Sequence, residues 1–133
     1  MKIILASYWE PENHGPGRKI GISPGKPRGL KYKCDFVLEA LSPDDDCYYK
    51  YHEQKTKDYE RAGQEFVQEY TDKLKEVVQQ VIDQAEEECV SPQEILKLQD
   101  GDTLLSWEKA GHLTYRTHTA EALRALGYEV EEN

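Results

Sequence analysis

Hydrophobic positions follow two spacings along the chain, one typical of buried strands and the other of amphipathic helices. Short apolar runs bounded by turn residues predict strands at residues 2–8, 18–23, 103–107 and 128–130. Apolar residues repeating every three or four positions predict helices at residues 31–41, 58–89 and 117–126. Ser42 with Pro43, and Ser91 with Pro92 and Glu94, are typical of helix starts, the second opening a short helix to about residue 98.

The longest periodic pattern, at residues 58–89, is too long for a helix confined to a small domain. At 1.5 Å per residue, one continuous helix of this reach would be about 48 Å long. The pattern therefore predicts either a kink, for which Gly63 is the weak point, or a helix that projects, and leaves its continuity open.

These elements favour one α/β domain over residues 1–133. The strands at 103–107 and 128–130 flank a single helix, and such a crossover joins parallel strands. We expect a small, mostly parallel sheet of about four strands, flanked by helices that include one long amphipathic helix.

The charge is distributed unevenly. The net charge is −9, but residues 1–33 contain seven Lys/Arg and two Glu, a balance of +5 that leaves −14 on the rest. An acidic protein is repelled by duplex nucleic acid, whereas a local basic loop suits a small phosphate or carboxylate group. An equally good interpretation of these basic residues is that they only keep the loop solvated.

Other features exclude several classes of protein. No apolar run is long enough to span a membrane, and no signal peptide precedes the first strand, so we expect a cytoplasmic protein. The histidines lack a metal-ligand spacing and the three cysteines form no CxxC pair, so we expect no metal, no disulfide framework and no cofactor. The glycine-rich segment at residues 21–27 departs from the phosphate-loop pattern of ATPases.

Ligands of open parallel sheets bind at the carboxyl ends of the strands, which selects a short set of candidate residues. Tyr8, Ser23, Lys26, Arg28 and Ser106 follow or end the first three strands, while Arg116 and Thr117 open the last helix, whose free N–H groups attract anions. Arg116 would grip an anion, with Lys26 and Arg28 adding charge from the loop.

Glu108, just after the third strand, is the candidate catalytic residue, as a general base or a nucleophile. The alternative is that Glu108 simply pairs with Arg116 across the intervening loop.

The stretch LLSWEKAGHLTYRTHTAEALRALGYEVEE, at residues 104–132, resembles the bacterial domain-of-unknown-function 488 family, whose pattern is roughly LLCxEKxxxxCHR followed by a helix and GxxV. The segments KIILASY, KIGISPGKP and DYERAGQEFVQEY follow the same order. The resemblance implies a compact α/β sandwich and places the family's glutamate, lysine and arginine on Glu108, Lys109 and Arg116. The family's two cysteines and its histidine fall on Ser106, Thr114 and Tyr115, which implies a member that lacks the thiol and the base.

Three hypotheses follow. The first is a module that binds a small anionic, phosphate- or nucleotide-like ligand at the carboxyl edge of the sheet. The second is a hydrolase or transferase acting on a nucleotide or glycosyl bond through Glu108. The third is a protein-interaction module that uses the acidic helix at residues 58–89, with a homodimer as one form of such an interaction.

Overall fold

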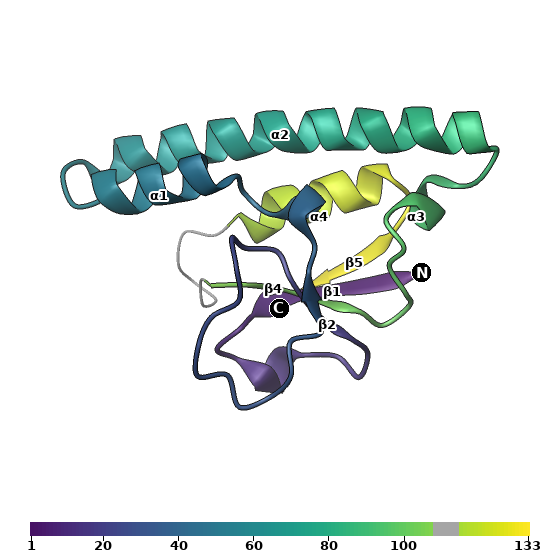
Figure 1. The fold of residues 1–133 in the computed structure, drawn as a ribbon, viewed down its shortest axis with the longest axis horizontal. Helices are drawn as coiled ribbons and strands as arrows, with labels where there is room; N and C mark the ends of the chain where they lie inside the picture. The colour runs from purple at the N-terminus through teal and green to yellow at the C-terminus, as the bar shows by residue number, and fades with distance from the viewer. Residues whose placement is uncertain (108–114) are drawn as a thin grey trace.

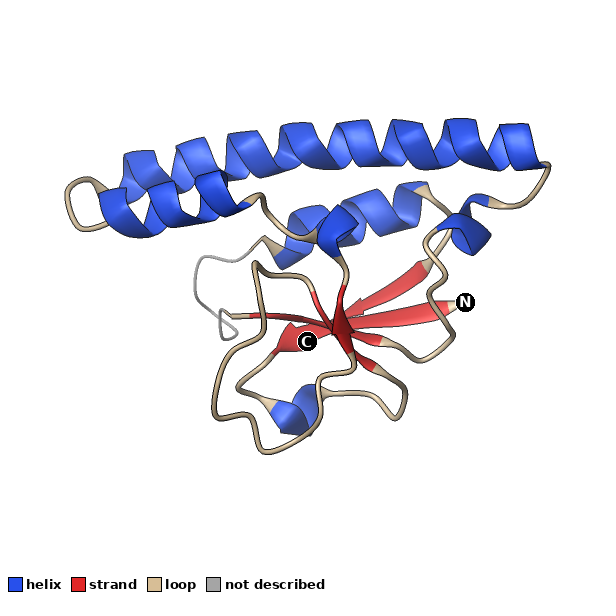
Figure 2. Ribbon diagram, viewed as in Figure 1, coloured by secondary structure: helices blue, strands red, loops and turns tan. Residues whose placement is uncertain are grey.

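The chain folds around a five-stranded sheet. The computed structural model describes residues 1–107 and 115–133. The strands are β1 (Lys2–Ser7), β2 (Lys19–Gly21), β3 (Phe36–Val37), β4 (Thr103–Ser106) and β5 (Glu129–Glu132), in the spatial order β3-β2-β4-β1-β5. Every pairing among these strands is parallel. The predicted α/β fold with one long helix is confirmed, with five strands in place of about four (Figures 1 and 2).

The two faces of the sheet are covered differently. The helices α1 (Asp45–Gln54), α2 (Tyr59–Glu88), α3 (Pro92–Ile95) and α4 (Arg116–Ala125) lie on one side, above the sheet in Figure 1, and enclose the main core. Loops and the short 3₁₀ helix η1 (Pro11–Asn13) lie on the other side. This second face has a small core built around Ala6, Tyr8, Cys34 and Leu105.

β1 occupies the interior of the sheet because its residues can be buried on both faces. It pairs with β4 on one side and β5 on the other. Ile3 and Leu5 belong to the main core and Ala6 to the smaller one, and all three are fully buried. A strand covered on both faces is a continuous apolar run, which is why the sequence identifies it.

The helix α2 is continuous over 30 residues. It begins after Asp58, whose side chain accepts a hydrogen bond from Arg61 N at 3.2 Å, and ends at Cys89, which has a left-handed φ of 57°. Gly63 lies inside the helix without ending it, and α2 extends past the sheet beside α1 (Figure 1). Its apolar stripe is buried by its own chain, at Ala62, Phe66, Tyr70, Leu74, Val77, Val81 and Ala85.

The helix predicted at residues 31–41 is wrong: this segment contains β3 and then the 3₁₀ helix η2 (Glu39–Leu41). Asp35 binds this segment to β2 instead, because its backbone N–H donates to Lys19 O at 2.7 Å and its carboxylate accepts from Lys19 N at 2.8 Å. These bonds align Phe36 and Val37 with β2 as an edge strand. The next helix begins at Asp45, after Asp44 as N-cap, instead of at Pro43.

The C-terminal part follows its local signals closely. Ser91 and Glu94 form the predicted capping box, although α3 ends at Ile95. Gly127 has a φ of +95°, so it supplies the left-handed residue predicted after α4. Across residues 1–107 and 115–133, none of the helices combines the length and the apolar character needed to cross a membrane.

Candidate functional site

The carboxyl ends of β1, β4 and β2 meet at one edge of the sheet, which brings several predicted site residues together. Ser7 of β1 lies opposite Ser106 of β4, and Tyr8 N donates to Ser106 O at 2.9 Å. Ile22 N, just after β2, donates to Leu105 O at 2.9 Å. The edge is therefore a contiguous surface formed by three strands that are far apart in the sequence.

Arg116 lies at this edge as the first residue of α4. It is only 4% exposed, and its Nη1 donates to Ser106 Oγ at 3.0 Å. Tyr115, which precedes it, donates its hydroxyl to Ile22 O at 2.6 Å and so ties the start of α4 to the end of β2. The positive end of α4 and a buried guanidinium thus coincide where the parallel strands end.

Tyr8 and Ser23 are joined to each other. The Tyr8 hydroxyl lies 2.8 Å from Ser23 Oγ, which also donates to Gly25 O at 2.9 Å. The Tyr8 ring crosses to β2 because Gly21 leaves room: a Cβ there would lie 2.1 Å from the Tyr8 hydroxyl. Burial raises the pKa of Tyr8 well above its usual value, so the phenol stays protonated.

The other residues predicted for the site differ in their surroundings. Lys26 Nζ donates to Cys34 O at 3.0 Å and so holds the loop after β2. Arg28 and Thr117 have exposed side chains. Glu108 lies outside the described residues, as do Lys109 and Thr114. The structure therefore joins Ser106 to Arg116 and Tyr8 to Ser23, and places Lys26 against the backbone of its own loop.

Part of the positive charge near the N-terminus is used within the fold. Arg18 forms a two-point ion pair with Asp102, and Lys19 Nζ donates to Gly15 O. The exposed cations of this segment are Lys2, Lys26, Arg28, Lys31 and Lys33, of which Lys2 pairs with Glu131 and Lys26 donates to Cys34 O. A balance counted along the sequence therefore overstates the charge that an anion would meet.

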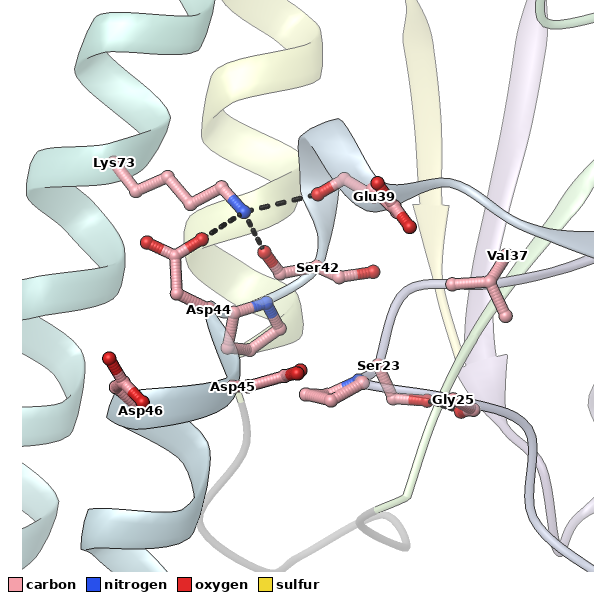
Figure 3. A pocket seen from close by; sticks show the side chains of 11 residues that line it. Ser23, Gly25, Val37, Glu39, Ser42, Asp44, Asp45, Asp46 and Lys73 are labelled. Carbon is pink, nitrogen blue, oxygen red and sulfur yellow. Dashed lines mark hydrogen bonds and ion pairs between the residues drawn. The ribbon is translucent and has the colours of Figure 1, made fainter.

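A second feature of this edge, which the sequence analysis missed, is an acidic pocket of about 650 Å³ beside β2 and β3. The loop at residues 23–25 forms one wall, and Glu39, Asp44, Asp45 and Asp46 bring carboxylates to the other side (Figure 3). Its one lysine, Lys73, is held by Asp44 Oδ1 at 2.8 Å, by Glu39 O at 3.1 Å and by Ser42 O.

The acidic pocket is unsuited to an anion, because its carboxylates outnumber its single, already paired cation. Any anion site at this edge therefore belongs on the side of Arg116. The run of three aspartates at residues 44–46 was the sequence signal for the pocket. Within the described part of the chain, no group of histidine, cysteine and acidic side chains has a geometry that could hold a metal ion.

Aromatic side chains line the opposite, loop-covered side of the same edge. Trp9 follows Tyr8 and is 37% exposed, with its ring 5.6 Å from that of Trp107. Tyr32 donates its hydroxyl to Tyr8 O at 2.7 Å, and its ring meets that of His14 edge-on at 5.0 Å. Trp9 lies just outside the first predicted strand and follows no apolar spacing, so the sequence gives no sign of this cluster.

The two buried cysteines, Cys34 and Cys47, are not activated thiols. All three cysteines are free, and burial raises the pKa of Cys34. The pKa of Cys47 is raised to about 12, first by burial and then by the carboxylate of Glu69. Thiolates are the reactive form, so both buried thiols are inert near neutral pH.

His14 is expected to make the stability of the fold depend on pH. Its Nε2 lies 2.7 Å from Ser7 O, and burial lowers its pKa, partly offset by that hydrogen bond. The unfolded chain, with a histidine pKa of about 6.5, then binds the proton more readily than the folded chain. Stability should therefore fall as the pH drops below that value, and His14→Gln should make the fall shallower in urea unfolding at pH 7.5 and 5.5.

His52 of α1 serves as a comparison, because burial and then Lys55 also lower its pKa. His52→Gln should remove a separate part of the slope, so the double variant should be the least sensitive to pH. A His14→Gln protein with the slope of the original chain would contradict the assignment.

Comparison of this chain with family models, with curated proteins and with solved structures found no match.

Proposed function

We propose that this protein binds a small anionic ligand, phosphate- or nucleotide-like, at the carboxyl edge of its sheet. The observation that carries the proposal is Arg116, a buried guanidinium fixed on Ser106 at the first turn of α4. Backbone N–H groups at a helix N-terminus and a guanidinium are both donors that favour phosphate oxygens. The first turn of α4 contains no acidic residue to compete for them.

The other residues of the proposed site contribute to ligand binding in different ways. Thr117, exposed at the second position of α4, offers a hydroxyl beside Arg116. Lys26 and Arg28 supply positive charge from the loop that follows β2, and attract the ligand over a range set by ionic strength. Tyr8 and Ser23 support that loop through their shared hydrogen bond.

A thermal-shift screen tests the proposal. The probes are inorganic phosphate, ribose 5-phosphate and adenosine and uridine monophosphates, with ribose and the nucleosides as uncharged controls. A ligand at 100 times its Kd adds about 2.7 kcal/mol to the free energy of unfolding, which is a shift of several degrees for a chain of this size. We expect shifts with phosphorylated probes only, and weaker shifts at high salt.

Paired charge variants locate the effect. Lys26→Ala/Arg28→Ala should weaken binding more than Lys31→Ala/Lys33→Ala, which removes two exposed lysines of the same segment. The two variants change net charge equally, so a general electrostatic effect would lower both affinities alike. That result, or the absence of a shift with every phosphorylated probe, would contradict the proposal.

A further inference from the structure

Trp9 is an exposed aromatic side chain on a well-supported turn. It comes two residues after the end of β1, and its backbone N–H donates to Ser7 Oγ at 3.1 Å. Glu10 N donates to Ser7 O at 3.3 Å, so the turn closes on the same serine. The Trp107 ring, tilted by 56° at 5.6 Å, supports the indole, which keeps 37% exposure. An aromatic ring held in this way loses little conformational entropy when it stacks on a ligand.

Trp9 and Arg116 are anchored to neighbouring residues of adjacent strands. The backbone N–H of Trp9 donates to Ser7 Oγ, and the Arg116 side chain donates to Ser106 Oγ. Ser7 and Ser106 are partners in the register of β1 and β4, and parallel strands lie about 4.8 Å apart. The stacking surface and the proposed anion anchor therefore belong to one edge of the sheet.

Trp107 is a costly residue at this position. Its Nε1 is buried and, among the residues that the structure describes, has no hydrogen-bond acceptor, whereas the Tyr8 and Tyr32 hydroxyls both have partners. An unsatisfied buried donor destabilises a protein. A phenylalanine would avoid that cost but would offer a smaller surface against Trp9 and Tyr8, which lies 6.1 Å away ring to ring. Position 107 therefore supplies a large indole ring against which Trp9 packs.

We infer that the ligand carries an aromatic ring that stacks on Trp9, so that it is a nucleotide and not a bare phosphate or a sugar phosphate. This inference rests on the proposed function and specifies its ligand class. A mononucleotide has a flat base at one end and a phosphate at the other, so it would lie across this edge, with its base on the indole at the loop-covered side and its phosphate at Arg116 on the helix-covered side. Bases of every type present a π-face, so stacking alone selects nucleotides without selecting the base.

Calorimetric titration of the full chain with adenosine monophosphate and ribose 5-phosphate tests this inference, because the two probes share the phosphate and differ in the base. We expect the nucleotide to bind about tenfold more tightly, which is within the range that base stacking on an aromatic side chain provides. Nucleotide binding should also change the tryptophan fluorescence, whereas ribose 5-phosphate should change it little.

Variants then separate the base from the phosphate. Trp9→Leu should lower the affinity for the nucleotide to that for ribose 5-phosphate and leave the sugar phosphate unaffected, while Trp9→Phe should keep most of the preference. Tyr49→Leu, which removes a 61% exposed ring from α1, is the matched control and should change neither affinity.

Equal affinities for the two probes, or an equal loss of both with Trp9→Leu, would overturn the stacking inference and leave the anion site intact. Failure of both probes to bind would overturn the proposed function together with this inference.

Discussion

Replacing Arg18 by methionine is expected to destabilise the fold by about 2–3 kcal/mol. Its Nε and Nη2 donate to the two carboxylate oxygens of Asp102 at 3.1 and 2.7 Å. The Asp102 side chain is 1% exposed, so Arg18→Met leaves a buried carboxylate without its cation. The Arg18 side chain is itself 30% exposed, and water reaching the pair keeps the loss below that of a fully buried one.

Urea unfolding measures this loss, and two variants define its origin. Arg18→Lys keeps the charge but not the planar two-point geometry, so an intermediate loss is expected. Arg61→Met removes an arginine from the exposed Arg61–Glu65 pair and should cost less than about 0.5 kcal/mol. Equal losses for Arg18→Met and Arg61→Met would contradict the importance of the buried carboxylate.

The double variant Arg18→Met/Asp102→Asn adds a test of coupling. Removing the carboxylate charge also removes the need for the cation. The losses of stability measured for the two single variants should therefore sum to more than the loss measured for the double variant. Asp102 accepts a further bond from Gln99 N at 2.7 Å, so Asp102→Asn alone also perturbs the turn before β4.

Strands that are buried on both faces could be predicted from the sequence, whereas the edge strand β3 could not. β1 and β4 are apolar runs whose burial follows from their composition. β3 has only two residues and exists because Asp35 and Leu38 bond to the backbone of β2. The spacing of apolar residues there fits a helix equally well, so tertiary hydrogen bonds decided its conformation.

The helix α2 shows where periodicity is sufficient and where it is not. The stripe on residues 58–89 predicted its extent to within one residue at each end. The effect of Gly63 could not be predicted, because a glycine inside a helix is tolerated when neighbouring turns are packed. Here the turns on both sides contribute Ala62 and Phe66 to buried positions, and the helix continues through the glycine.

The location of the candidate site could be predicted from the sequence, but which of the nearby charged side chains form ion pairs within the fold could not. The rule that ligands bind at the carboxyl ends of parallel strands selected Ser106 and Arg116, and the structure joins them by a hydrogen bond. In contrast, Arg18 is paired with a residue 84 positions away. Contacts of that separation leave no pattern in a single sequence, so a count of basic residues cannot distinguish structural cations from those that face a ligand.

Arg116→Met is expected to weaken the binding of phosphorylated probes by at least about 100-fold, equivalent to about 2.7 kcal/mol. Methionine fills much of the same space but cannot form the charge-assisted hydrogen bonds that a guanidinium makes to phosphate. Arg116→Lys keeps the positive charge and loses the planar fork, so an intermediate loss is expected. Calorimetric titration with adenosine monophosphate measures both.

Arg124→Met is the matched control, because it makes the same substitution on the same helix. Arg124 is 48% exposed and binds Val130 O and Glu132 at the outer side of β5, so its loss should leave the affinity unchanged. Circular dichroism of each variant shows whether the fold is retained, and Arg116→Lys provides the test if Arg116→Met unfolds. Equal affinities for the Arg116 and Arg124 variants would contradict the anchor role of Arg116, since Arg116 and not Arg124 bonds to Ser106 at the end of β4.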